Sequence, residues 1–171
     1  ETEPKGALFR LSPEGAFTEI ETGIITSNGQ GFSPDRSTYY YTDTMRRTVW
    51  AYDYDVETGS LGNRRPFIET HGEPGRPDGL TVDKDGGLWV AMWEGFSVLR
   101  YDKAGKKVAE IPMPVAKPTS CAFGGPDLSS LYITSARVGL DAAHLAARPL
   151  SGGLFVVDTD TRGQTEPRFR G

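Results

Sequence analysis

Short apolar runs alternate with clusters of Gly, Pro, Asp and Ser along the whole chain. Three times, an apolar run, an Asp/Gly-rich turn and a second run rich in aromatic and branched residues follow one another, at residues 27–43, 77–91 and 118–134. Short runs bounded by turn residues are typical of β-strands. The pattern predicts an all-β fold, and only residues 141–147, within a longer connection, favour a helix.

The three strand pairs are parts of a longer repeat. A third strand is predicted after each pair, at residues 49–53, 98–102 and 154–158, and residues 7–12 resemble these third strands. Weaker fourth strands are predicted at residues 66–69 and 107–111. Four strands per unit, repeated every ~40–50 residues, indicate the blades of a β-propeller. The three successive tyrosines at 39–41 are expected to alternate between the two faces of one blade.

The number of predicted blades is smaller than a closed propeller needs. The chain opens on a third strand, contains two complete units and stops inside the next, which makes roughly three and a half blades, whereas closed propellers have about four to eight. An open arc exposes unpaired strand edges. We therefore expect the rest of a longer protein, or another copy of this chain, to complete the arc, and the first is favoured. An ordinary open antiparallel sheet or sandwich is the alternative.

Charge and composition exclude some classes of partner. The chain has 19 Lys and Arg against 23 Asp and Glu, a net charge of −4, and no basic cluster. Nucleic acids and anionic membranes are therefore not expected as partners, because both attract basic surfaces. No apolar run approaches the ~18 residues that span a bilayer. A single cysteine, Cys121, excludes an internal disulfide and is compatible with a reducing compartment, so a cytoplasmic location is expected.

Two polar residues occupy equivalent positions in their repeats. Asn28 and Asp78 each precede a glycine at the start of a first strand. First strands lie nearest the axis of a propeller, so the two side chains are expected to converge on one central pocket. Thr119 and Ser120 hold the equivalent position in the third repeat and are expected to line the same cavity. The alternative is structural, since Asn-Gly and Asp-Gly are common turn dipeptides.

Four motifs, in this order, resemble the second half of the SMP-30/gluconolactonase/luciferin-regenerating enzyme family, also called the regucalcin family. They are Ser27-Asn28-Gly29 with Phe32-Ser33-Pro34-Asp35, then Tyr52-Asp53-Tyr54-Asp55 through Asn63-Arg64-Arg65, then Pro77-Asp78-Gly79 with Gly87-Leu88-Trp89-Val90-Ala91, and then Pro118-Thr119-Ser120-Cys121-Ala122-Phe123-Gly124-Gly125. The resemblance implies a six-bladed propeller, of which this chain supplies roughly the last three and a half blades. Residues 1–171 would then be the C-terminal portion of a single propeller domain.

The resemblance also implies a metal site and an activity. It places two of the family's three metal ligands on Asn28 and Asp78, while the third, a Glu, belongs to the part that this chain lacks. Such an oxygen set suits Ca²⁺, Mg²⁺ or Mn²⁺, and related proteins also accept Zn²⁺. The implied reaction is opening of a sugar lactone such as glucono-1,5-lactone, with Asp78 as a candidate general base. Two alternatives are a non-catalytic propeller that binds a cation or a protein, and a related hydrolase with another ester substrate.

Other titratable residues are given structural roles. Neither His71 nor His144 has the spacing of a metal ligand, and the chain has no nucleophile elbow, phosphate-binding loop or dinucleotide fingerprint. These absences favour metal-assisted hydrolysis over covalent or cofactor chemistry. The remaining aspartates in turn-like contexts are expected to cap turns or face solvent. They are Asp35, Asp43, Asp53, Asp55, Asp85 and Asp102.

Overall fold

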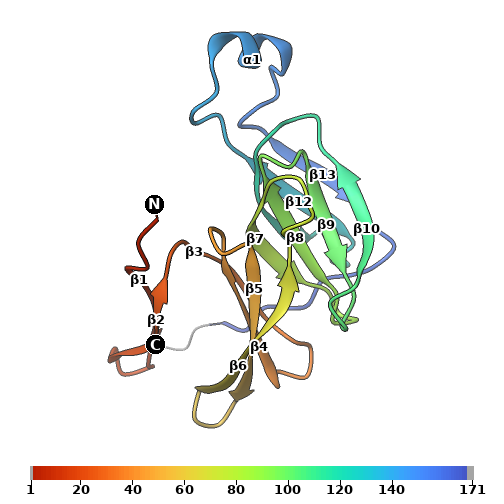
Figure 1. Cartoon of the computed structure of the whole chain (residues 1–171). Helices are drawn as coiled ribbons and strands as arrows, with labels where there is room; N and C mark the ends of the chain where they lie inside the picture. Colours follow the sequence, from red (N-terminus) through yellow and green to blue (C-terminus); the bar gives the residue numbers. More distant parts are fainter. Residues whose placement is uncertain (1, 169–171) are drawn as a thin grey trace.

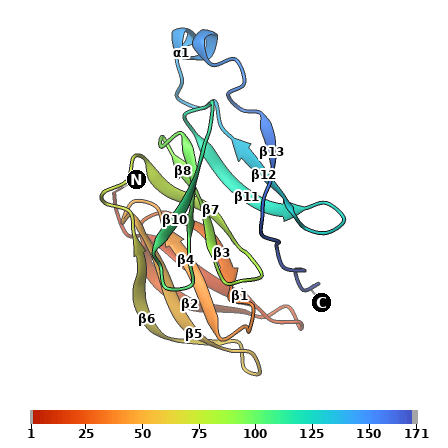
Figure 2. The ribbon, with the colours of Figure 1, turned by 90° about the vertical axis from the view of Figure 1, so that its right-hand side faces the viewer.

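The computed structural model describes residues 2–168, which form four antiparallel sheets arranged side by side (Figures 1 and 2). The first sheet holds two strands, β1 (Gly6–Leu11) and β2 (Phe17–Ile24). The second holds β3 (Ser27–Phe32), β4 (Thr38–Asp43), β5 (Thr48–Asp55) and β6 (Ser60–Glu69). The third holds β7 (Arg76–Val82), β8 (Leu88–Trp93), β9 (Ser97–Tyr101) and β10 (Lys107–Pro112). The fourth holds β11 (Pro118–Gly124), β12 (Ser130–Ser135) and β13 (Leu154–Asp158).

Consecutive strands are neighbours in every sheet, so each sheet is an up-and-down meander. The β-strands predicted from the apolar runs are all present, and the prediction of an all-β propeller arc is confirmed. The chain begins with the outer half of one blade, β1 and β2, and continues through two four-stranded blades to a three-stranded one. The predicted arc of roughly three and a half blades agrees with this count.

The apolar core lies between the sheets, as expected when blades pack face to face. One cluster joins the second sheet to the third through residues such as Val49, Leu80 and Val90. Another joins the third sheet to the fourth, through Val98, Cys121 and Ile133 among others. The tyrosines of β4 divide as predicted, since Tyr40 belongs to the first of these clusters while Tyr39 and Tyr41 pack on the opposite face toward β2.

The predicted helix is α1 (Ala142–Ala147), in the connection between β12 and β13. Asp141 is its N-cap and accepts a hydrogen bond from the backbone N–H of His144 at 2.7 Å, which satisfies one of the free donors of the first turn. The connection projects beyond the sheets at the top of Figures 1 and 2. No helix within residues 2–168 is both long and apolar enough to span a membrane.

Residues 159–164, after β13, run across the ends of three sheets, and we call them the crossing segment. Lys84 N–H donates to Arg162 O at 2.8 Å, and Gly163 N–H donates to Leu128 O at 2.8 Å. Gln164 Nε2 donates to the carbonyl oxygens of Phe32 at 3.2 Å and Val82 at 3.3 Å. The segment therefore bonds to residues of the second, third and fourth sheets.

Candidate metal centre

The first strands of the three larger sheets lie next to one another, with β7 packed between β3 and β11. Glycines allow this close approach. A Cβ atom at Gly29 would lie only 2.7 Å from the carbonyl oxygen of Asp78, and one at Gly79 would lie 2.7 Å from Ser120 Cα. Gly29 directly follows Asn28, and Gly79 directly follows Asp78. The close packing of the strands at these glycines therefore brings the expected site residues of neighbouring sheets together.

Asn28 and Asp78 lie side by side on β3 and β7. The Asn28 side chain hydrogen-bonds to the Asp78 carboxylate, and its Nδ2 also donates to Thr44 Oγ1 at 3.1 Å. Partial burial raises the pKa of Asp78 to about 6, although the hydrogen bonds from Asn28 and from the Gly79 N–H act in the opposite direction. An amide and a carboxylate that are 50 residues apart in the sequence thus share one site.

Thr119 and Ser120 follow on β11. Ser120 is exposed and packs against Gly79, directly beside Asp78, whereas the Thr119 hydroxyl lies 2.7 Å from Thr134 Oγ1 on β12. Ser120 is therefore the next side chain along from Asp78, while the Thr119 hydroxyl already has a partner within its own sheet.

The donor set at Asn28 and Asp78 fits a hard divalent cation. Both side chains offer oxygen, which Ca²⁺, Mg²⁺ and Mn²⁺ prefer. The Asp78 carboxylate is held where burial disfavours its negative charge, and a bound cation would offset that cost. Two protein oxygens are fewer than the six to eight that Ca²⁺ takes, and no group of three His, Cys, Asp or Glu side chains suited to a metal occurs within residues 2–168. Further ligands would have to come from water or from protein outside these residues.

Asp43 is expected from the sequence to cap a turn or face solvent, and it does hold a turn, but its full burial shows that the solvent-facing alternative is wrong. Its side chain is fully buried and accepts hydrogen bonds from the backbone N–H groups of Ile25 at 3.0 Å and Thr26 at 3.1 Å. It also pairs with Arg46 Nε at 3.1 Å. Asp43 therefore fixes the turn that leads into Ser27 and Asn28, a role that depends on tertiary contacts and that turn composition alone did not reveal.

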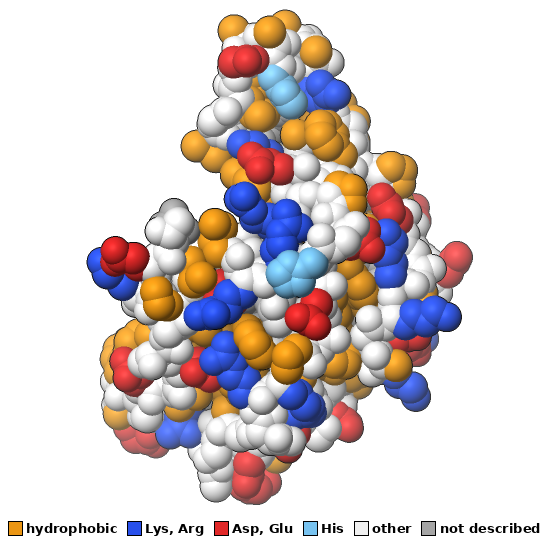
Figure 3. Space-filling model, in the orientation of Figure 1, with side chains coloured by type: hydrophobic (Ala, Val, Ile, Leu, Met, Phe, Trp, Pro, Cys, Tyr) orange, Lys and Arg blue, Asp and Glu red, His pale blue; other side chains and the backbone are white. Residues whose placement is uncertain are grey.

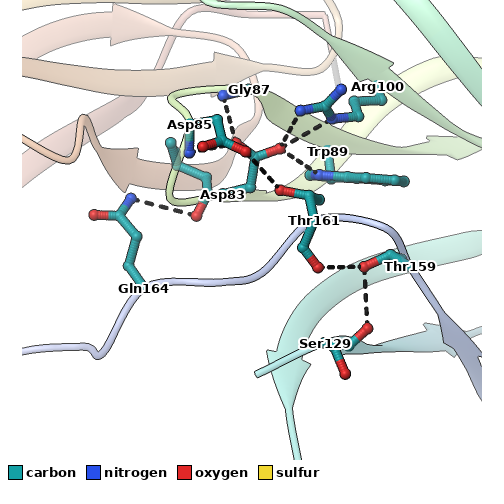
Figure 4. A network of polar contacts seen from close by, with 10 residues as sticks. Asp83, Asp85, Gly87, Trp89, Arg100, Ser129, Thr159, Thr161 and Gln164 are labelled. Atoms are coloured by element: carbon teal, nitrogen blue, oxygen red, sulfur yellow. Dashed lines mark hydrogen bonds and ion pairs between the residues drawn. The ribbon is translucent and has the colours of Figure 1, made fainter. Parts of the chain in front are cut away.

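A second buried carboxylate, Asp83, was not singled out from the sequence (Figure 4). Its Oδ2 accepts hydrogen bonds from Trp89 Nε1 at 3.0 Å and from Arg100, while its Oδ1 accepts from the Gly87 N–H at 2.8 Å. Trp89 and Arg100 are direct cross-strand partners on β8 and β9. The sequence contains both partners of Asp83, but only the strand register shows that Trp89 and Arg100 lie opposite each other.

Charged side chains of both signs are interspersed on the face shown in Figure 3. One cation, Lys117, is buried just before β11. Its Nζ donates to Val138 O at 2.9 Å and lies 4.6 Å from the centre of the Trp93 ring. These contacts attach the connection that carries α1 to the third sheet.

Comparison with known proteins identifies the family that the chain resembles. The family model of the SMP-30/gluconolactonase/LRE-like region matches residues 1–137. Pentonolactonase XacC from Haloferax volcanii is 44% identical over 169 residues, which cover 96% of this chain and 57% of that protein. Regucalcin from Gallus gallus is 40% identical over 154 residues, which cover 90% of this chain and 52% of regucalcin. The crystal structure of regucalcin from Agrobacterium tumefaciens, described as a calcium-binding protein, superposes with a TM-score of 0.93 at 34% identity, covering 98% of this chain and 57% of that one.

These relatives are longer than the chain, which spans about half the length of the curated proteins that it matches. The match nonetheless extends over most of its residues, in sequence and in fold. The chain belongs to the SMP-30/gluconolactonase/luciferin-regenerating enzyme-like family.

Proposed function

We propose that the protein to which this chain belongs is a metal-dependent lactonase that opens a sugar lactone such as glucono-1,5-lactone. The observation that carries the proposal is the contact between Asn28 and the half-buried Asp78 carboxylate, whose pKa is raised to about 6. Similarity to a pentonolactonase over 96% of this chain supports the reaction class. Similarity to a calcium-binding regucalcin supports the divalent cation.

Asn28 and Asp78 would hold the cation through their side-chain oxygens. A divalent cation bound there would act as a Lewis acid toward the lactone carbonyl and lower the pKa of a bound water. The ion would be Ca²⁺, Zn²⁺, Mn²⁺ or Mg²⁺, with oxygen ligands favouring the harder ions.

Asp78 is also the candidate general base. With a pKa of about 6 it is mostly ionised at neutral pH, yet it is a stronger base than an ordinary aspartate. A carboxylate that binds a cation loses basicity, so ligation and proton transfer compete for the same group. Ser120, which lies next along the first strands, is the candidate hydrogen-bond donor to the sugar hydroxyls.

Hydrolysis of glucono-1,5-lactone and of a pentonolactone by the complete protein tests this proposal. We expect activity that is lost on chelation, restored by Ca²⁺, Mn²⁺ or Zn²⁺, and lost in Asp78→Asn. Asp53→Asn is the matched control, because Asp53 is exposed on β5 and pairs with Arg65. Full activity after chelation or in Asp78→Asn would contradict the metal mechanism.

Two other functions are distinguished by the same experiment. Cation binding without turnover of any lactone would favour a non-catalytic cation- or protein-binding propeller. Turnover of other esters, but not of lactones, with the same dependence on Asp78 would favour a related hydrolase.

We also propose that further protein closes the arc at its two ends. On the fourth sheet Leu154 and Val156 are 67% and 59% exposed, and on the first sheet Phe17 is 75% exposed. A cavity of about 430 Å³ opens between the first and second sheets, lined by residues that include Leu8 and Tyr54. The missing part of the same protein is the favoured occupant, and another copy of this chain is the alternative. Adding the separately expressed missing part, or measuring the mass of the isolated chain in solution, distinguishes the two.

A further inference from the structure

We infer that Thr44 is a positioning residue, which holds the Asn28 amide so that its oxygen is the atom available to a cation. This inference rests on the proposed function, because it concerns one of the two proposed ligands. It adds a residue that does not itself touch the metal.

Thr44 directly follows β4 and is 8% exposed. Its backbone N–H donates to Thr26 O at 3.1 Å, which fixes Thr44 against the turn between β2 and β3. Its Oγ1 accepts the hydrogen bond from Asn28 Nδ2 at 3.1 Å. The backbone hydrogen bond of Thr44 to Thr26 thus places the Thr44 hydroxyl beside the Asn28 side-chain amide.

The orientation of the Asn28 amide decides whether that side chain can be a ligand. An amide binds a cation through its oxygen, because its NH₂ group has only donors to offer. Asn28 Nδ2 donates to Thr44 Oγ1 at 3.1 Å, and the Asn28 side chain also hydrogen-bonds to the Asp78 carboxylate. An ionised carboxylate only accepts hydrogen bonds, so both contacts use the NH₂ group and leave Oδ1 for another partner.

The buried Asp43 makes this arrangement rigid. Its carboxylate accepts from the backbone N–H groups of Ile25 and Thr26, and Ser27 on β3 is the register partner of Asp43 on β4. Ser27 and Asp43, the residues directly before Asn28 and Thr44, are therefore cross-strand neighbours. Side chains that orient a metal ligand typically contribute about 10- to 100-fold to metal affinity.

The test compares Thr44→Val, which keeps the shape but removes the hydroxyl, with Thr44→Ser, which keeps the hydroxyl. In the metal-free complete protein, hydrogen exchange of the Asn28 side-chain NH₂ is followed by NMR. We expect faster exchange in Thr44→Val than in the unmodified protein and little change in Thr44→Ser. Thr44→Ala serves as a second hydroxyl-free variant if Thr44→Val does not fold.

Mn²⁺ affinity is then measured by electron paramagnetic resonance in the complete protein with the same variants and with Asp78→Asn. Thr44→Val should bind Mn²⁺ about 10- to 100-fold more weakly, and Thr44→Ser should bind it like the unmodified protein. If hydroxyl-free variants that fold show unchanged NH₂ exchange and unchanged affinity, the role of Thr44 is refuted while the metal site stands. If the unmodified protein binds no Mn²⁺, or if Asp78→Asn binds it equally well, the proposed metal site fails instead.

Discussion

The Arg100 guanidinium donates two hydrogen bonds to a single oxygen of Asp83, from Nε at 2.9 Å and from Nη2 at 2.8 Å. The Asp83 side chain is fully buried, and its other oxygen accepts the backbone N–H groups of Asp85 at 3.0 Å and Gly87 at 2.8 Å. The carboxylate thus connects the turn between β7 and β8 to the face of β9. Thr161 of the crossing segment bonds to the neighbouring Asp85 at 3.1 Å (Figure 4).

We expect Asp83→Ala to destabilise the chain by about 3–5 kcal/mol, because it leaves Arg100 with an uncompensated charge in a partly buried site. Urea unfolding measures this loss. The matched control is Asp53→Ala, which breaks an Arg–Asp pair on the exposed surface of β5 and β6. That control should change stability little, and equal losses in the two variants would contradict a special role for the buried pair.

Asp78→Asn should stabilise the metal-free chain at neutral pH. The folded-state pKa of Asp78, about 6, lies above the value of about 3.9 expected in the unfolded chain, so the folded state binds more protons between these two values. Stability therefore falls as the pH rises from about 4 to 6 and stays lower above that range. The side chain of the asparagine variant does not titrate, so the variant does not lose this stability as the pH rises.

The expected gain from Asp78→Asn is about 1–2 kcal/mol at pH 7.5 and close to zero at pH 3.5, with allowance for the solvent that reaches the carboxylate. Urea unfolding at both pH values, in a chelator, measures it. A difference between the two proteins that does not vary with pH would show that the Asp78 carboxylate is not perturbed.

Gly29→Ala should destabilise the chain by about 1–3 kcal/mol, since the new methyl group would press on the backbone of Asp78 and Leu80. Gly62→Ala, on β6, is the control, because an added Cβ there meets no atom within 4 Å. Thermal unfolding compares the two variants. If Gly29→Ala is as stable as Gly62→Ala, β3 and β7 do not need the close approach described above.

Gln164→Ala should cost about 1–2 kcal/mol, since it removes both hydrogen bonds from Nε2 to Phe32 O and Val82 O. Glu166→Ala, two residues further along, is the control, because Glu166 is exposed. Chemical denaturation measures the cost, and hydrogen exchange at the ends of β3 and β7 locates it. If only residues 159–164 lose protection, then Gln164 does not stabilise the ends of β3 and β7.

The sequence predicted the repeat, the convergence of β3, β7 and β11 and the strands other than β2, because each of these depends on local periodicity or on a repeated turn. The adjacency of Asn28 and Asp78 follows from the repeat, since equivalent positions of neighbouring blades must lie close together. The buried roles of Asp43 and Asp83 did not follow. Both aspartates are next to turns, as many solvent-exposed aspartates are, and their burial depends on partners from other strands.

The crossing segment was equally hidden, because residues 159–164 carry no apolar periodicity and are held through backbone groups and polar side chains. Its partners lie as far as 132 residues away in the sequence. Sequence patterns predict contacts along a strand or within a repeat. The crossing segment bonds to three different repeats, so no such pattern predicts its contacts.

The distance between Gln164 and Phe32 has a consequence for biosynthesis. Phe32 is translated 132 residues before Gln164, so at about 5–20 residues per second a ribosome takes about 7–26 seconds to supply the side chain that bridges β3 and β7. Until Gln164 is available, β3 and β7 lack this bridge and depend on their other contacts, which include the apolar faces of their sheets. Chaperone demand should therefore be greatest late in translation, after the third sheet has emerged and before the crossing segment is available.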